Sequence, residues 1–441
     1  MPLPTLSDRV VSRKRGGWRL RAILPMAGGV DRLRLTPGGP FRVTLVRVVR
    51  RCTALAAVCC LALAVAAVAV LAGTGEKPAP QRDEWRIRLV KRTAPQFDRY
   101  TDAATPRVRA WMNDKLWRAV VFSPYFDDKT SWFRHGWSYR NLYGIPVGSG
   151  LARRHPGWIL RDARGRRLYV QYGCSGGRCA QYAGDVANPG FRRHWIAEAR
   201  RALAPGYAGL WIDDVNLEVR VSDGQGRMVL PVRHGRQMTP EDWRNAVASF
   251  VTAIRRALPR AEIVHNAIWF AGGARRQDDP AVRREIRAAD VINLERGVND
   301  TGLTGEGPWS VGALLRYVDA VHALGRSVVF EGVDPSDAGR EYNLAAELLA
   351  TDGRDAVGIY DTTPDDFWAP YGFDLGAAEG AREVRDDGVL VRRFARGLVL
   401  LNPPGAPPRT VGLDGQHLDA RGRRIGEVRL GAGRGAVLRT A

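Results

Sequence analysis

Apolar runs alternate with amphipathic segments through most of the chain, and this alternation predicts its secondary structure. Eight runs rich in β-branched and aromatic residues predict strands at 118–126, 142–149, 167–173, 208–215, 261–269, 289–295, 326–332 and 356–361. Three intervening segments, 189–203, 240–258 and 311–325, carry apolar residues at helical spacing. Thr239 and Pro240 suit the N-cap and N1 positions of the second helix, which predicts where it begins.

Strands that alternate with helices predict an α/β fold, and eight such strands favour a (β/α)8 TIM barrel. A doubly wound open sheet is the alternative, but no Gly-x-Gly-x-x-Gly loop follows the first predicted strand, so its usual nucleotide chemistry is missing. From about residue 382 the pattern changes to short strands separated by Gly, Pro and Asp turns. The sequence therefore predicts a barrel domain at 95–380 and a small C-terminal antiparallel β-domain at 381–441.

The segment 52–73 has no charged residue in 22 positions, which is long enough to cross the hydrocarbon core of a bilayer as a helix. Residues 1–51 hold 12 Lys and Arg but 2 Asp and Glu, so the positive-inside rule places this basic segment in the cytoplasm. A cleaved signal peptide and a start at Met26 are alternatives, and both leave the rest of the chain outside the cytoplasm. We therefore expect a single-pass anchor in the cell membrane, a linker at 74–94 and an extracytoplasmic globular region.

The chain is basic, with a net charge of +21, which raises the possibility of a nucleic-acid partner. Nearly half of this excess lies in residues 1–51, and no basic run is interleaved with aromatic residues. A nucleic-acid partner is therefore disfavoured. The 13 Trp residues are many for 441 residues, and some are expected to offer ring faces to a flat ligand such as a sugar, although core packing explains most of them.

Two of the five cysteines, Cys174 and Cys179, bracket a short Ser-Gly-Gly-Arg turn, while the other three lie within 52–73. In an oxidising compartment this pair predicts a disulfide that staples one loop. A metal site is not expected, because no further Cys or His lies close enough in the sequence to complete one.

In a parallel barrel the working residues lie where the strands end, so the polar residues that close each apolar run are the candidate site residues. These are Tyr125 and Asp127 (first run), Asp213 and Asp214 (fourth), His265, Asn266 and Trp269 (fifth), Glu295 (sixth), Glu331 (seventh), and Tyr360 and Asp361 (eighth). A ring of carboxylates and aromatic side chains at one face is the layout that glycoside hydrolysis requires. One carboxyl group protonates the leaving oxygen, and the other attacks the anomeric carbon or activates water.

Each of these residues also has a purely structural explanation. An Asp after a strand often caps the next helix, and successive strand residues point to opposite faces, so only one of Asp213 and Asp214 can face the barrel axis. Glu295 and Glu331 could form salt bridges with the many Arg residues. His265 and Asn266 are as consistent with structural hydrogen bonds as with ligand contacts, and the other aromatic and acidic residues are expected to bind substrate.

The segments 185–195 (DVANPGFRRHW), 209–219 (GLWIDDVNLEV) and 291–297 (VINLERG) together resemble the glycoside hydrolase-like TIM-barrel proteins of the GHL15 type. The resemblance covers roughly residues 95–441 and implies a barrel that cleaves glycosidic bonds. It assigns the carboxylate after the fourth strand to Asp213 or Asp214. Some related enzymes take the acid from the fifth strand, which offers no carboxylate here, so Glu295 is the preferred acid and Glu331 the second choice.

These observations predict a glycoside hydrolase or transglycosylase that acts on a cell-surface or secreted polysaccharide, with Asp213 or Asp214 and Glu295 as catalytic residues. The proposed mechanism requires no cofactor. The alternative is a catalytically inactive barrel that binds surface polysaccharide. A metal-dependent deacetylase is disfavoured because the seven His residues show no His-x-x-x-His spacing. The sequence indicates no oligomeric state.

Overall fold

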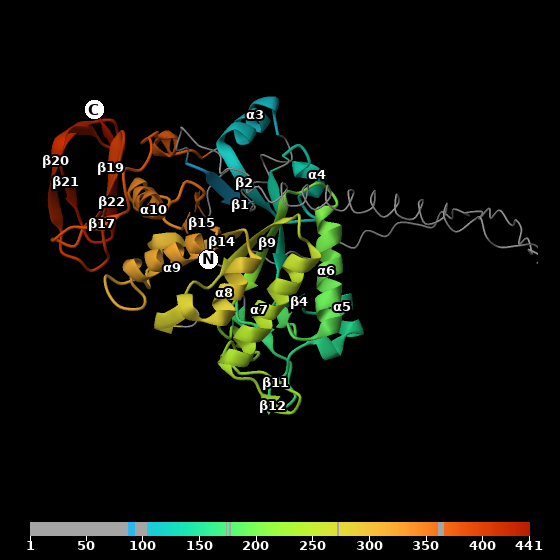
Figure 1. Cartoon of the computed structure of the whole chain (residues 1–441). Coiled ribbons are helices and arrows are strands. Elements are labelled where there is room, and N and C mark those ends of the chain that lie inside the picture. Colours follow the sequence, from blue (N-terminus) through green and yellow to red (C-terminus); the bar gives the residue numbers. More distant parts are fainter. Residues whose placement is uncertain are drawn as a thin grey trace, which may run out of the picture. The chain divides into compact units, whose positions relative to one another are not determined.

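The computed structural model describes residues 87–92, 104–133, 135–172, 174–175, 178–270, 273–359 and 366–441. Within these residues, eight parallel strands close into a barrel in the order β1-β16-β15-β14-β13-β9-β3-β2 (Figure 1). The barrel strands are β1 (Leu89–Arg92), β2 (Leu116–Val121), β3 (Gly136–Asn141), β9 (Gly209–Val215), β13 (Glu262–Ala267), β14 (Val291–Arg296), β15 (Ser327–Gly332) and β16 (Ala356–Ile359). The predicted TIM barrel is confirmed.

The predicted basic segment 1–51, the predicted membrane-spanning segment 52–73 and most of the predicted linker lie outside the described residues. Among the helices that the structure describes, none combines the length and the apolar character needed to cross a bilayer.

Helices follow the barrel strands in the alternating order expected of this fold (Figure 1). The longer ones are α3 (Pro106–Lys115), α6 (Pro189–Leu203), α7 (Pro240–Ala257), α8 (Pro280–Ala288), α9 (Val311–Ala323) and α10 (Asp337–Ala350), and two short ones are α4 (Asp127–Thr130) and α5 (Gly150–Arg154). Helix α7 begins as predicted, because the Thr239 side chain accepts a hydrogen bond from the Asp242 backbone N–H and the Asp242 carboxylate accepts one from that of Thr239.

Two of the predicted barrel strands, 142–149 and 167–173, are wrong. These segments form short strands in a separate antiparallel sheet, of order β10-β5-β8-β4, that lies in the connections leaving β3 and β9. Its strands are β4 (Gly144–Pro146), β5 (Tyr169–Val170), β8 (Gln181–Ala183) and β10 (Val221–Ser222). The barrel instead uses β1, which lies inside the predicted linker 74–94, and β3, which the sequence did not predict as a strand.

The barrel interior is filled by one apolar side chain from each strand. Val90, Val120, Trp137, Trp211, Val264, Val291, Val329 and Ala356 pack together as a cluster separate from the main core. The residues next to them, such as Leu210 and Ile212, belong instead to the larger cluster that the helices cover. Side chains alternate between the two faces of a strand, so this layer identifies which later residues also point into the barrel.

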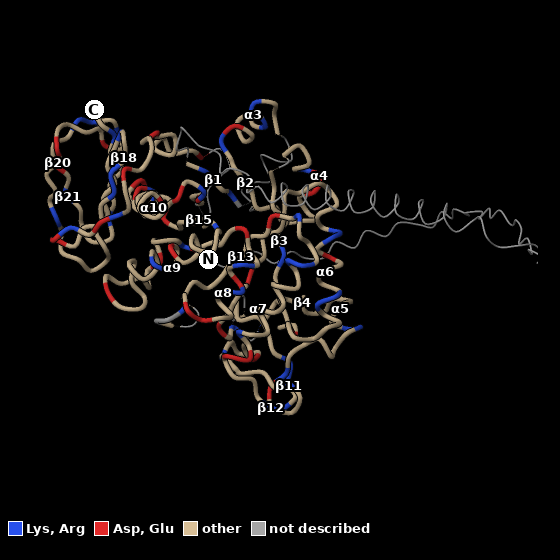
Figure 2. The backbone as a smooth tube through the Cα atoms, viewed as in Figure 1, with Lys and Arg blue, Asp and Glu red and all other residues tan. Residues whose placement is uncertain are grey.

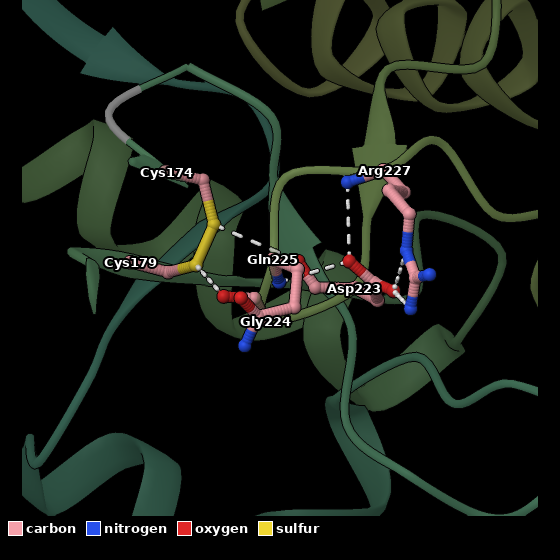
Figure 3. The surroundings of a disulfide bond; sticks show 6 residues. All are labelled: Cys174, Cys179, Asp223, Gly224, Gln225 and Arg227. Atoms are coloured by element: carbon pink, nitrogen blue, oxygen red, sulfur yellow. Dashed lines mark hydrogen bonds and ion pairs between the residues drawn. A yellow bond between two sulfur atoms is a disulfide. The ribbon is translucent and has the colours of Figure 1, made fainter. Parts of the chain in front are cut away.

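A disulfide bond joins Cys174 and Cys179, as predicted. It lies against the turn at 223–227, with Cys174 Sγ 3.7 Å from the Asp223 carbonyl oxygen and Cys179 Sγ 3.8 Å from that of Gly224 (Figure 3). The Asp223 carboxylate holds this turn closed by accepting hydrogen bonds from the backbone and the side chain of Arg227. The disulfide therefore staples the loop that leaves β3 where it meets the loop that leaves β9.

An antiparallel sheet of order β17-β18-β19-β22-β20-β21 follows the barrel. Its strands are β17 (Glu383–Val384), β18 (Leu390–Phe394), β19 (Gly397–Asn402), β20 (Arg409–Leu418), β21 (Arg424–Leu430) and β22 (Arg434–Thr440). One face has its own apolar cluster, which includes Leu398, Leu400 and Leu438. The opposite face joins the main core and packs on α10, where a Cβ added to Gly435 would lie 2.7 Å from that of Ala345.

Lys and Arg lie among Asp and Glu along the barrel and the C-terminal sheet (Figure 2). Arg382, for example, pairs with Asp319, and Arg340 pairs with Asp366 at 2.6 Å. Many of the basic side chains of the described region are therefore engaged in local ion pairs.

Glu347 on α10 makes the stability of this region depend on pH. Burial and the charge of Asp355 raise its pKa from 4.5 to about 8. The folded protein therefore binds this proton more tightly than the unfolded chain, so the contribution of Glu347 to stability is greatest below about pH 4.5 and is lost as the pH rises to about 8. We expect Glu347→Gln to raise the free energy of unfolding at pH 8 by up to about 4 kcal/mol.

Urea unfolding of the wild type and Glu347→Gln at pH 5 and at pH 8 measures this effect. Glu379→Gln, at an exposed position, is the matched control and should change neither value. The interpretation fails if Glu347→Gln leaves the difference between the two pH values as large as in the wild type.

Candidate active site

Polar side chains form a second layer inside the barrel, on the carboxyl-end side of the apolar layer. Two positions after the interior residues come Tyr139 (β3), Asp213 (β9), Asn266 (β13), Asn293 (β14) and Glu331 (β15), with Glu295 a further two positions along β14. Because these residues share the parity of the interior layer, they point to the barrel axis. The structure thus brings together Asp213, Asn266, Glu295 and Glu331, all of which were predicted from the sequence.

A single amide links the two principal carboxylates. Asn266 Nδ2 donates to Asp213 Oδ1 at 2.9 Å and to Glu295 Oε2 at 2.7 Å. These two carboxylate oxygens therefore lie no more than 5.6 Å apart, the sum of the two hydrogen-bond lengths. Glu295 is exposed and Asp213 is half-buried, so a ligand entering the barrel mouth can reach both.

A second amide extends the network to the next strand. Asn293 Nδ2 donates to Asn266 Oδ1 at 2.9 Å and to Glu331 Oε2 at 2.8 Å. Asn293 and Glu331 are buried, so these hydrogen bonds hold the amide of Asn266 in the orientation that presents Nδ2 to Asp213 and Glu295. Sequence reasoning missed Asn293, although its parity with Glu295 on the same strand could have identified it.

Tyr139 holds the other oxygen of Asp213. Its hydroxyl donates to Asp213 Oδ2 at 2.7 Å, and its ring stacks between Phe122 and Trp211, with ring centroids 4.5 and 5.6 Å away. Burial, followed by the charge of Asp213, raises the pKa of Tyr139 well above its ordinary value, so the hydroxyl remains a donor. Tyr139 was missed because the polar segment that contains it was not predicted as a strand.

Asp214 lies at a break in the strand, directly after Asp213. Its φ of 57° is left-handed, and the pairing of β9 with β13 shifts register at this point. Its carboxylate accepts hydrogen bonds from Asn141 Nδ2 and Asn216 Nδ2 at 2.5 and 3.0 Å. Burial and the charge of Asp213 raise the pKa of Asp214 to about 7, which limits the negative charge beside Asp213 below that pH.

The structure places two residues predicted on the fifth strand away from this cluster. His265 points outwards and lies fully buried against α8, where its Nδ1 is 2.6 Å from Glu285 Oε1. Trp269 is buried in the loop after β13, where its ring makes edge contacts with Phe270 and Trp309. The hydrogen bond of His265 is the structural alternative that the sequence left open.

Tyr125 and Asp127 also lie away from the cluster. Asp127 accepts hydrogen bonds from Ser123 and from Tyr207, and Tyr207 precedes β9 at the end opposite Asp213. Tyr125 is exposed beside Lys129. The remaining predicted site residues, Tyr360 and Asp361, lie outside the described residues.

In the described part of the chain, His322, Asp352 and Asp355 bring potential metal-ligand atoms within 4.8 Å of one another. Asp355 immediately precedes β16, so this group lies at the opposite end of the barrel from Asp213. His322 forms an ion pair with Asp355 at 2.9 Å. Burial alone would lower the pKa of His322, but the hydrogen bond and charge of Asp355 raise it. The ion pair links α9 to the start of β16.

Comparison with protein-family models and with curated protein sequences gives no match. Among solved structures, the chain is similar to the glycoside hydrolase domain of PelA from Pseudomonas aeruginosa, with 16% identity, a TM-score of 0.37, and coverage of 64% of this chain and 96% of that domain. An alpha-amylase from Lactobacillus plantarum has 11% identity and a TM-score of 0.46, with coverage of 81% and 99%.

An alpha-galactosidase from Lactobacillus brevis has 11% identity and a TM-score of 0.44, and the match covers 81% of this chain but 55% of that one. These identities and scores are low.

Proposed function

We propose that this protein is a glycoside hydrolase or transglycosylase with Asp213 and Glu295 as its catalytic pair. The observation that carries the proposal is the shared hydrogen bond from Asn266, which holds one oxygen of each carboxylate within 5.6 Å of the other at the barrel mouth. Two carboxyl groups flanking one bond are what the hydrolysis of a glycoside requires. The resemblance of three sequence segments to the GHL15 type is consistent with this activity.

The separation favours a mechanism that retains the anomeric configuration. Retaining enzymes place their carboxyl groups about 5 to 5.5 Å apart, whereas inverting enzymes leave about 6.5 to 9.5 Å for a water molecule. Asp213 attacks the anomeric carbon, and Glu295 gives its proton to the leaving oxygen as that bond breaks. Glu295 then removes a proton from water, or from a sugar hydroxyl in transglycosylation, and the attacking oxygen displaces Asp213 from the sugar.

Asp213 is the better nucleophile of the adjacent pair. It faces the barrel axis, and it accepts hydrogen bonds from Tyr139, Asn266 and the backbone N–H of Asp214, which orient it. Asp214 has a left-handed backbone, and both of its carboxylate oxygens accept hydrogen bonds from asparagine side chains. We therefore assign Asp214 a supporting role in shaping the strand end.

The substrate we propose is a polysaccharide outside the cytoplasm. This part of the proposal depends on the uncharged segment 52–73 and the basic residues before it, which favour an extracytoplasmic barrel held near the membrane. Protease treatment of intact cells tests the topology, because an extracytoplasmic barrel is cleaved and a cytoplasmic one is protected.

The stereochemistry of the product tests the mechanism. We expect the full chain to release reducing ends from a polysaccharide in a panel of acidic and neutral polymers. Proton NMR of the first product should show the same anomeric configuration as the substrate. Release of the opposite anomer would contradict Asp213 as nucleophile, and binding without any release would favour the catalytically inactive barrel.

A further inference from the structure

A groove with a volume of about 550 Å³ lies beside the candidate active site. It is lined by residues from the loops that follow β9, β13 and β14, including Arg220, Met228, Phe270 and Trp309. These three strands carry Asp213, Asn266 and Glu295. The groove is therefore built from the same three loops that border the catalytic pair.

Contacts between side chains connect the groove to the strand end. Asn216 bonds to the carboxylate of Asp214 at 3.0 Å and to the hydroxyl of Tyr143 at 3.0 Å. The Tyr143 hydroxyl in turn donates to the backbone carbonyl oxygen of Arg220 at 3.4 Å. Two side chains thus separate the carboxylate of Asp214, the neighbour of Asp213, from the groove wall at Arg220.

Trp309 offers the groove an exposed but fixed ring. It is 46% exposed, and its ring packs against Phe270 with centroids 4.6 Å apart. Arg276 donates to the carbonyl oxygen of Pro308 at 2.7 Å while its guanidinium lies 4.8 Å from the ring centroid of Trp269. The backbone beside Trp309 is thereby tied to the loop after β13, and a flat apolar face held open to solvent is suited to stacking on a sugar ring.

Arg220 gives the same groove a positive charge. Its guanidinium lies 5.8 Å from the ring centroid of Phe270, and among the described residues no carboxylate pairs with it, although Glu218 also lines the groove. The neighbouring Arg244, by contrast, pairs with Glu218 at 3.3 Å and with Asp279 at 2.9 Å. An unpaired, half-buried guanidinium next to an aromatic face matches a planar acid group carried on a sugar.

We propose that this groove binds an anionic sugar residue of the polymer, with the sugar ring stacked on Trp309 and its acid group paired with Arg220. The proposal rests on the proposed function, because the groove would hold a neighbouring unit of the chain that Asp213 and Glu295 cleave. It assigns an acidic polysaccharide as the substrate class, and the acid group is a carboxylate or a sulfate ester.

Affinity electrophoresis of the full chain in detergent tests the proposal without turnover, in an Asp213→Asn background. The gels contain polygalacturonate, dextran sulfate or neutral dextran. We expect retardation by polygalacturonate or by dextran sulfate, and the polymer that retards the protein identifies the acid group. Arg220→Gln and Trp309→Ala should each weaken the apparent affinity by about tenfold or more, and Trp309→Phe should retain most of it.

The chain is basic overall, so the control must remove one charge elsewhere. Arg107→Gln, at an exposed position on α3, should leave retardation unchanged. The proposal is overturned if Arg220→Gln behaves like Arg107→Gln, if neutral dextran retards the protein as strongly, or if none of the polymers retards it. Groove-dependent retardation with no hydrolysis by the wild type would sink the proposed function and leave the groove as a binding site.

Discussion

Replacing Asp213 by Asn is expected to lower kcat by about 1,000-fold or more while leaving the fold intact. The substitution keeps the shape of the side chain and its contact with Tyr139 but removes the charge that attacks the anomeric carbon. Release of reducing ends from the polymer that the wild type cleaves measures the effect. Adding azide to Asp213→Gly should restore turnover of an aryl glycoside and yield a glycosyl azide of inverted configuration, since the small anion enters the space of the missing carboxylate.

Asp214→Asn is the matched control, because it makes the same chemical change at the adjacent position. Its side chain keeps the size that fits between Asn141 and Asn216, and we expect it to lose about tenfold or less in kcat. If Asp214→Asn abolished turnover while Asp213→Asn remained active, the assignment of the nucleophile would be reversed.

Glu295→Gln is expected to lower kcat on the polymer by about 100-fold to 10,000-fold, the usual contribution of a general acid. The loss should be much smaller on a 2,4-dinitrophenyl glycoside, because that leaving group departs without a proton. Comparison of kcat on the two substrates measures this difference. If Glu295 had only a structural role, Glu295→Gln would lower kcat on both substrates equally, whatever the leaving group.

Glu331→Gln discriminates between the two candidate acids. Glu331 is buried and accepts a hydrogen bond from Asn293. Its replacement should therefore lower kcat on the polymer and on the 2,4-dinitrophenyl glycoside to a similar degree. If Glu331→Gln showed the leaving-group dependence and Glu295→Gln did not, the acid would belong to the seventh strand.

The sequence predicted the barrel better than its individual strands. The apolar runs from 208 to 361 correspond to β9, β13, β14, β15 and β16, because strands buried on both faces read as continuous apolar segments. β1 was missed because its four residues include two basic side chains and so show no clear apolar run. β3 was missed because its later half is polar. The apolar runs at 142–149 and 167–173 instead form the small sheet beside the mouth.

The candidate site was predictable in its carboxylates but not in its amides. Strand parity counted from Trp211 identifies Asp213 rather than Asp214 as the residue facing the axis, and counted from Val291 it identifies Glu295. The amide of Asn266 donates to both carboxylates because the closed barrel and its strand register place the three side chains together. No local sequence pattern encodes that register. The bulge that gives Asp214 its left-handed backbone likewise arises from the pairing of β9 with β13.

The packing of α10 has a consequence for how this protein can be divided. Of the helix residues Asp337–Ala350, the segment 342–350 is buried throughout, with β15 on one side and the C-terminal sheet on the other. A chain shortened before β17 would present much of that surface to water, and the isolated sheet would lose the partner of its second face. The barrel and the sheet belong to one compact unit, so neither can be exchanged for a different domain unless the surface of α10 is replaced as well.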